Sequence, residues 1–188
     1  MNILREYITE ILRENQPKFK KKLRVFDFDD TLVKTGSIIH VTNSSGENFD
    51  LTPGEFAIYT AQPGDTFDFS DFSKLVDPQE IKWTVKILRD IVSSGGEVVI
   101  LTARAHAPPV HEFLQLAGIP PLEVVALGDS NPQRKSEYIK GRIEGEGFDL
   151  VEFFDDSYKN ILAVESLKPL FPGVVIKTKH IVHRREIS

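Results

Sequence analysis

The sequence predicts an α/β fold with three layers, in which helices cover both faces of a central parallel sheet. The first observation is that strand-like and helix-like segments alternate from residue 78 to residue 178. Such alternation implies right-handed βαβ crossovers, which build a parallel sheet. The second is that the strand-like segments are rich in Val, Ile and Leu, as in strands buried on both faces. The third is that acidic or hydroxyl residues directly follow several of these strands.

Local patterns place each element in turn. Strands are expected over residues 23–28, 97–103, 122–128, 148–156 and 173–178, and helices over residues 78–96, 108–119, 132–143 and 157–169. Gly95 and Gly96 close the first helix, and prolines begin the second. Residues 37–60 are expected to form a hairpin with strands at 37–42 and 49–60, and residues 62–79 a loop.

Composition bounds the classes of function. The chain has 188 residues and a net charge of −5, so its bulk charge does not predict a polyanion-binding protein. It contains no cysteine, which excludes disulfides and thiolate zinc sites and fits a cytoplasmic protein. No apolar stretch approaches the roughly 20 residues that span a bilayer, so we expect no membrane partner.

The first 16 residues predict an amphipathic helix that precedes one domain over residues 17–188. Apolar residues recur there at helical spacing, and charged residues interrupt them, unlike in a secretory signal. The helix is expected to dock on its own domain or on a protein partner.

Acidic residues gather where the predicted strands end. Asp27, Asp29 and Asp30 follow the first strand, and Asp155 and Asp156 end the fourth. Because ligands bind beyond the carboxyl ends of parallel strands, these acids are expected to converge. Carboxylates held a few ångströms apart repel one another, and Mg²⁺, which prefers oxygen ligands, removes that cost. The sequence therefore predicts a magnesium site at this edge.

The strand-end residues resemble the motifs of the haloacid dehalogenase (HAD) superfamily. "DFDDT" at 27–31 matches the first motif, Asp-x-Asp-x-Thr, and Thr102 in "VVILTAR" matches the second. Lys135 at a helix start matches the third motif, and Asp155 with Asp156 the fourth. The resemblance implies a HAD-like Rossmannoid fold with a short hairpin flap near 37–60 and no large cap.

The resemblance also implies the chemical roles. Asp27 would be the nucleophile that forms an aspartyl-phosphate, and Asp29 the general acid and base. Thr102 and Lys135 would stabilise the transferring phosphoryl group. The Mg²⁺ ligands would come from Asp27, from the Asp29 backbone carbonyl and from Asp155 or Asp156, of which we favour Asp156.

Several alternatives stay open at this point. Arg134 or Lys140 could take the part of Lys135. Asp129 or Ser130 is expected to cap the following helix. His180 and His183 could form a metal pair, but surface histidines are the favoured interpretation.

A narrower resemblance concerns the substrate. The stretch 101–122 resembles the 3′-phosphatase domain of phage polynucleotide kinase–phosphatases, with Arg104 two residues after the second motif. Arg104 would then bind substrate phosphate, since a guanidinium grips phosphate with two hydrogen bonds. Thr102 departs from the serine that is frequent there, and no phosphate-binding kinase loop is present.

The expected function is therefore a Mg²⁺-dependent phosphomonoesterase that acts on nucleic-acid ends, in the host cytoplasm if the chain is phage-encoded. A short flap would leave the site open to such large substrates. One alternative is the same chemistry on a nucleotide or small phosphoester. The other is a HAD fold kept as a non-catalytic binding or structural module.

Overall fold

The computed structural model describes residues 19–182 and confirms the mixed α/β fold with a central parallel sheet. The sheet contains, in spatial order, β10 (Val175–His180), β9 (Leu150–Asp155), β1 (Lys22–Phe26), β7 (Glu97–Thr102) and β8 (Glu123–Ala126). All four neighbouring pairs are parallel. The expected helix at 1–16 and His183 lie outside the described residues.

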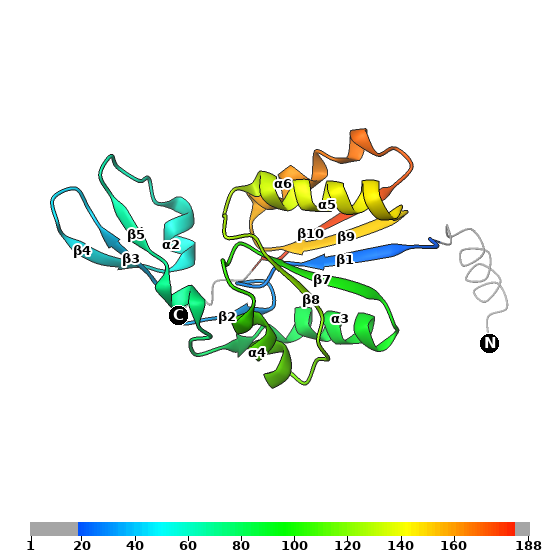
Figure 1. Cartoon of the computed structure of the whole chain (residues 1–188), viewed down its shortest axis with the longest axis horizontal. Coiled ribbons are helices and arrows are strands. Elements are labelled where there is room, and N and C mark those ends of the chain that lie inside the picture. Colours follow the sequence, from blue (N-terminus) through cyan, green and yellow to red (C-terminus); the bar gives the residue numbers. More distant parts are fainter. Residues whose placement is uncertain (1–18, 183–188) are drawn as a thin grey trace, which may run out of the picture.

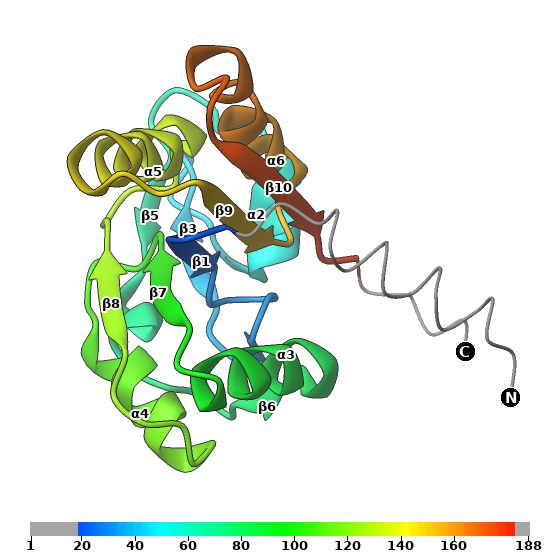
Figure 2. The same cartoon turned by 90° about the vertical axis from the view of Figure 1, so that its right-hand side faces the viewer.

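Helices cover both faces of the sheet, which gives three layers (Figures 1 and 2). α3 (Lys82–Ser93) and α4 (Pro108–Leu116) lie on one face, and α5 (Pro132–Glu146) and α6 (Tyr158–Glu165) on the other. The described chain also contains two short 3-10 helices, η1 (Ser70–Ser73) and η2 (Lys168–Leu170).

Alternate residues of the central strands feed two separate cores, because successive side chains of a strand point to opposite faces. Leu23 and Val25 of β1 pack with the α5 and α6 side of the sheet. Phe26 packs with the α3 and α4 side, where its ring stacks on Phe154 of the neighbouring strand with centroids 4.2 Å apart. This alternation also decides which way the residues after β1 point.

An inserted module lies beyond the carboxyl ends of the central strands (Figure 1). It consists of β3 (Ile39–Thr42), β4 (Asn48–Leu51), β5 (Thr66–Asp68) and α2 (Pro53–Ile58), with the strands antiparallel in the order β4-β3-β5. The short pair β2 (Val33–Lys34) and β6 (Gln79–Glu80) joins the two ends of the insertion. Its own aromatic cluster packs the module together, with ring contacts among Phe49, Phe56, Tyr59, Phe67, Phe69 and Phe72.

The expected hairpin over 37–60 is only partly correct. Its strands β3 and β4 pair as predicted, but the segment 53–58 is a helix and not a strand. Thr52 caps that helix in a reciprocal capping box with Glu55, and Pro53 occupies its first turn, which favours helix over strand. The residues 66–68, expected in a loop, add the third strand by pairing with β3. The insertion is thus a small folded unit.

Within residues 19–182, no helix has both the length and the apolar character needed to cross a membrane.

Candidate active site

Asp27 is the first residue after β1 and lies at the carboxyl edge of the sheet. Its backbone N–H donates to the Phe154 carbonyl at 2.9 Å, which continues the pairing between β1 and β9. Asp27 keeps the alternation of Leu23 and Val25, so its side chain points to the α5 side of the sheet. Asp27 is only 6% exposed, so its carboxyl group is buried in the protein.

Lys135 meets Asp27 from the first turn of α5. Lys135, Ile139 and Ile143 are the buried residues four apart along this helix, so the lysine shares the face that packs on the sheet. Its Nζ donates to Asp27 Oδ1 at 2.5 Å and to Asp155 Oδ2 at 2.8 Å. Burial opposes the ammonium charge, but the two carboxylates outweigh it and hold the Lys135 pKa above its usual value.

The two alternatives to Lys135 point elsewhere. Arg134 is exposed and pairs with Asp129 at 3.1 Å and with Glu137 at 3.4 Å. Lys140 is 46% exposed and pairs with Glu144 on the same helix.

The cap of α5 differs from the expectation, which was Asp129 or Ser130. Asn131 caps the helix, while Asp129 accepts from the Asn131 backbone N–H.

Asp155 is fully buried at the end of β9 and has its oxygens occupied by protein donors. Its Oδ1 accepts from the Ser157 backbone N–H at 2.8 Å, and the Asn160 amide lies 3.0 and 3.1 Å from its two oxygens. Asn160 was not identified from the sequence. The signal that could have found it is its place in the first turn of α6, five residues after the acid.

Asp27, Asp155 and Asp156 can together offer one oxygen each to a single cation. These oxygens lie within 4.8 Å of one another. Burial, together with the Asp155 and Asp156 charges, raises the pKa of Asp27 well above its usual range despite Lys135. Burial, then the charges of Asp155 and Asp30, raise the pKa of Asp156 to about 7. Both pKa values are raised because negative charges held close together inside the protein are unfavourable.

Two threonines support this edge of the sheet. Thr102 ends β7, next to β1, and is 1% exposed; its Oγ1 accepts from the Arg104 backbone N–H at 3.1 Å. Thr31, the last residue of the first motif, accepts from the Asp156 backbone N–H at 3.1 Å. Thr31, in the loop after β1, therefore holds the backbone of the acid pair at the end of β9.

Asp29 and Arg104 form a bidentate ion pair. Arg104 Nε donates to Asp29 Oδ2 at 2.8 Å, and Nη2 donates to Asp29 Oδ1 at 2.7 Å. The Asp29 carboxylate is held by Arg104 and is not part of the group of three acids. The expected substrate-binding role of Arg104 and the expected backbone metal contact of Asp29 stay predictions.

His180, the described member of the expected histidine pair, does not belong to the group of three acids either. Its Nε2 lies 2.8 Å from the Asp156 backbone oxygen, and its ring packs near Tyr158 with centroids 5.5 Å apart.

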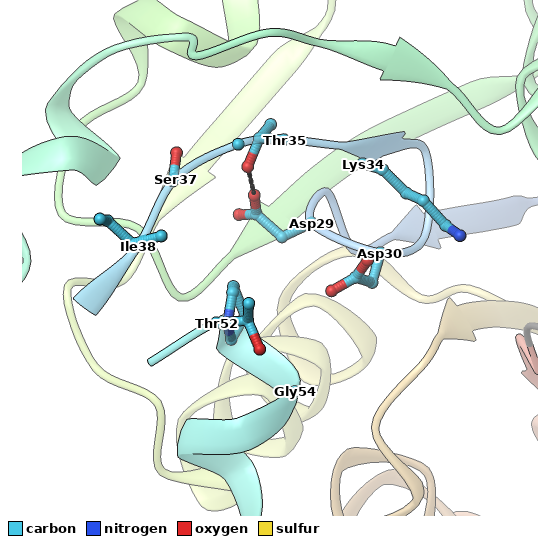
Figure 3. A pocket seen from close by; sticks show the side chains of 10 residues that line it. Asp29, Asp30, Lys34, Thr35, Ser37, Ile38, Thr52 and Gly54 are labelled. Carbon is cyan, nitrogen blue, oxygen red and sulfur yellow. Dashed lines mark hydrogen bonds between the residues drawn. The ribbon is translucent and has the colours of Figure 1, made fainter. Parts of the chain in front are cut away.

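A cavity of about 320 Å³ opens beside Asp29. Its walls are Asp29 and Asp30 after β1, the segment 34–38, and residues 52–54 at the start of α2. Figure 3 shows Asp29 between the 35–38 segment and the first turn of α2. The inserted module therefore supplies part of the wall of this cavity.

Comparisons with known proteins name no family. No protein-family model matches the chain, and no curated protein does so. Similar solved structures include a hypothetical protein from Xanthomonas campestris, with 19% identity and a TM-score of 0.40. The match covers 87% of this chain and 66% of that protein, so the chain spans just under two thirds of its length. A similarity of this size carries no argument about function.

Proposed function

We propose that this chain is a HAD-type, Mg²⁺-dependent phosphomonoesterase that acts through an aspartyl-phosphate on Asp27. The observation that carries the proposal is the contact of Lys135 with both Asp27 and Asp155 beside Asp156, at the carboxyl edge of a parallel sheet. A buried carboxylate oriented by an ammonium group is suited to attack phosphorus. Ligands of parallel α/β sheets bind at this edge.

The donor set fits Mg²⁺. It consists of carboxylate oxygens, the hard ligands that Mg²⁺ prefers. Three carboxylates and the Lys135 ammonium leave two negative charges, which one divalent cation balances. We favour Asp156 over Asp155 as the direct ligand, because Asp155 already accepts from Lys135, Ser157 and Asn160. Mg²⁺ would supply charge stabilisation for the transferring phosphoryl group.

The reaction divides into two displacements. In the first, an Asp27 oxygen bonds to phosphorus while the bond to the leaving oxygen breaks, and Asp29 gives that oxygen a proton. In the second, a water oxygen bonds to phosphorus, the bond to Asp27 breaks, and Asp29 takes the water proton. Lys135 orients Asp27 in both steps and offsets charge on the phosphoryl oxygens, and the Thr102 hydroxyl donates to one of them.

For the substrate, we propose a phosphate at a nucleic-acid end, with a 3′-phosphate as the first candidate. The support is the similarity of residues 101–122 to phage 3′-phosphatase domains. The cavity beside Asp29, at about 320 Å³, is at the lower end of the size range of small-ligand sites, and in this proposal it would receive the leaving group. It would hold the terminal nucleoside, while the rest of the strand stays outside.

The cavity also favours a second candidate, a free nucleotide or another small phosphoester. A cavity of this size accepts a single nucleoside without any polymer attached. The third candidate is a non-catalytic binding module. In such a module, the buried acids and Lys135 would only form a cation site.

Assays with and without Mg²⁺ test these candidates in sequence. Wild-type protein is expected to hydrolyse p-nitrophenyl phosphate only with Mg²⁺, and Asp27→Asn is expected to remove this activity. Asp90→Asn, which changes an exposed acid on α3, is the matched control and should turn over normally. Full turnover by Asp27→Asn would disprove the nucleophile assignment. No turnover by wild type, with Mg²⁺ still raising its melting temperature, would favour the binding module.

The substrate is then decided by comparing a 3′-phosphorylated oligonucleotide with the 3′-mononucleotide of the same base. A higher kcat/KM on the oligonucleotide supports action on nucleic-acid ends. Equal values would favour the nucleotidase.

A further inference from the structure

Arg104 has no N–H group left for a substrate in the described arrangement. A guanidinium carries five N–H donors. Two bind the Asp29 oxygens, and two from Nη1 bind the carbonyls of Phe72 and Lys74, both at 2.9 Å. The fifth lies toward Thr35 Oγ1 at 3.4 Å.

The Arg104 side chain is buried and lies close to two aromatic rings. Its side chain is 1% exposed, against 22% for that of Asp29. Its guanidinium carbon lies 5.2 Å from the ring centroids of Phe28 and of Phe72. Phe28 stands between Asp27 and Asp29 in the chain, whereas Phe72 belongs to η1, near the end of the insertion. Arg104 therefore contacts the candidate acid–base residue on one side and the inserted segment on the other.

We propose that Arg104 is a positioning residue that holds Asp29 as a proton acceptor and links its position to the 72–74 segment. This inference rests on the proposed function. With both oxygens accepting from the guanidinium, Asp29 is arranged for the second displacement, in which it takes a proton from the attacking water. For the first displacement, one Asp29 oxygen has to leave Arg104 to carry the proton for the leaving group.

Replacement of Arg104 should therefore slow the two displacements unequally. The leaving group of p-nitrophenyl phosphate departs without a proton, so formation of the aspartyl-phosphate on Asp27 needs Asp29 least. Its hydrolysis by water still needs Asp29 as the base. Arg104→Met is expected to slow hydrolysis by about 10²-fold, the lower end of the usual general-base contribution. The phosphorylated enzyme then accumulates.

Rapid mixing of Arg104→Met with p-nitrophenyl phosphate and Mg²⁺ tests this expectation. The expected result is a burst approaching one p-nitrophenol per enzyme, followed by slow turnover with an unraised KM. A raised KM with no burst would mean that Arg104 binds substrate phosphate, and would overturn the proposal. If both displacements slowed equally and the melting temperature fell, Arg104 would have a purely structural role, which would also overturn the proposal.

Arg142→Met is the matched control. Arg142 is a partly buried arginine with ion pairs to Glu97, Glu123 and Glu146, outside the candidate site. It should lower stability without producing a burst. Arg104→Lys serves if Arg104→Met does not fold: it keeps the charge but cannot make the forked contact, and should show the same burst with smaller amplitude.

Hydrogen exchange tests the link without relying on activity. Asp29→Asn and Arg104→Lys are each expected to raise amide exchange over residues 70–77, and Arg142→Met is not. Unchanged exchange in both would overturn the link between Asp29 and the inserted segment. Lack of turnover by wild type would instead overturn the proposed function and the kinetic role with it, so the two failures are distinguishable.

Discussion

The ammonium of Lys135 lies 2.5 Å from Oδ1 of Asp27, although 108 residues separate the two in the chain. The same ammonium lies 2.8 Å from Asp155 Oδ2, so one cation holds the ends of two neighbouring strands together. All three groups are buried. This contact connects the stability of the protein to the chemistry proposed for it.

Replacing Lys135 should cost stability as well as activity. Lys135→Met leaves the Asp27 and Asp155 carboxylates buried without their cation, which costs about 3–5 kcal/mol of unfolding free energy. Urea unfolding of both proteins in EDTA measures this loss of unfolding free energy. Lys140→Met, which removes an exposed lysine of the same helix, should cost less than about 1 kcal/mol.

A double variant makes this prediction more specific. Adding Asp27→Asn to Lys135→Met should recover part of the loss, because one of the unpaired charges is gone. Strictly additive losses would show that the contact contributes no coupling energy.

The metal-free protein should lose stability as the pH rises from about 4 to about 7. The pKa of Asp156 is about 7 in the folded protein against 3.8 ordinarily, so the folded state keeps a proton that the unfolded chain has released. Stability then falls with rising pH and stays at the lower level above pH 7. Asp27 acts in the same direction, since burial raises its pKa too.

Melting temperatures in EDTA at pH 5 and pH 8 measure this dependence. Asp156→Asn should melt higher than wild type at pH 8 and show a flatter dependence on pH. Asp90→Asn should follow wild type, since Asp90 is an exposed residue that pairs with Lys86 on its helix. A wild-type melting temperature that rises from pH 5 to pH 8 would contradict the prediction.

Mg²⁺ should stabilise the folded protein, and more at pH 8 than at pH 6. A ligand at 100 times its dissociation constant adds about 2.7 kcal/mol, which corresponds to roughly 5–10 °C for a chain of this size. The shift shrinks at pH 6 because protons compete for Asp27 and Asp156. Thermal unfolding with MgCl₂, against KCl at equal ionic strength, measures it, and Asp156→Asn should lose most of the shift.

Asn160 should matter for metal affinity even though it is not a proposed ligand. Its amide contacts both Asp155 oxygens, so Asn160→Ala should cost about 1.5–3 kcal/mol of stability. Asp155 is one of the three acids around the candidate metal site, although Asp156 is the favoured direct ligand, so releasing Asp155 should weaken Mg²⁺ binding by about 10-fold, the lower end of the effect seen for partners of metal ligands. Calorimetric titration measures the affinity. Asn131→Ala, which removes the cap of α5, should cost stability without changing Mg²⁺ affinity. Equal affinities for Asn160→Ala and wild type would rule out the positioning effect.

The sequence by itself determined the layered α/β fold and the strand ends at which the acids gather. Both follow from short-range patterns: runs of Val, Ile and Leu mark buried strands, and parallel strands bring their carboxyl ends to one edge. The position of Lys135 could also be anticipated, because a residue in the first turn of α5 lies at that edge. The inserted module was only half anticipated: the local cap signal of Thr52, Pro53 and Glu55 was overlooked, and the pairing of 66–68 with β3 depends on a strand distant in the sequence.

Only the tertiary structure decided how the side chains between these elements pair. The substrate-binding role expected for Arg104 stays a prediction, but the contacts of its long side chain with Asp29 and the Phe72 carbonyl are ones that no local pattern encodes. The cavity beside Asp29 arises in the same way, because its walls come from segments that meet only when the chain is packed. Strand and helix patterns extend over a few residues, whereas ion pairs and cavities depend on distances across the whole fold.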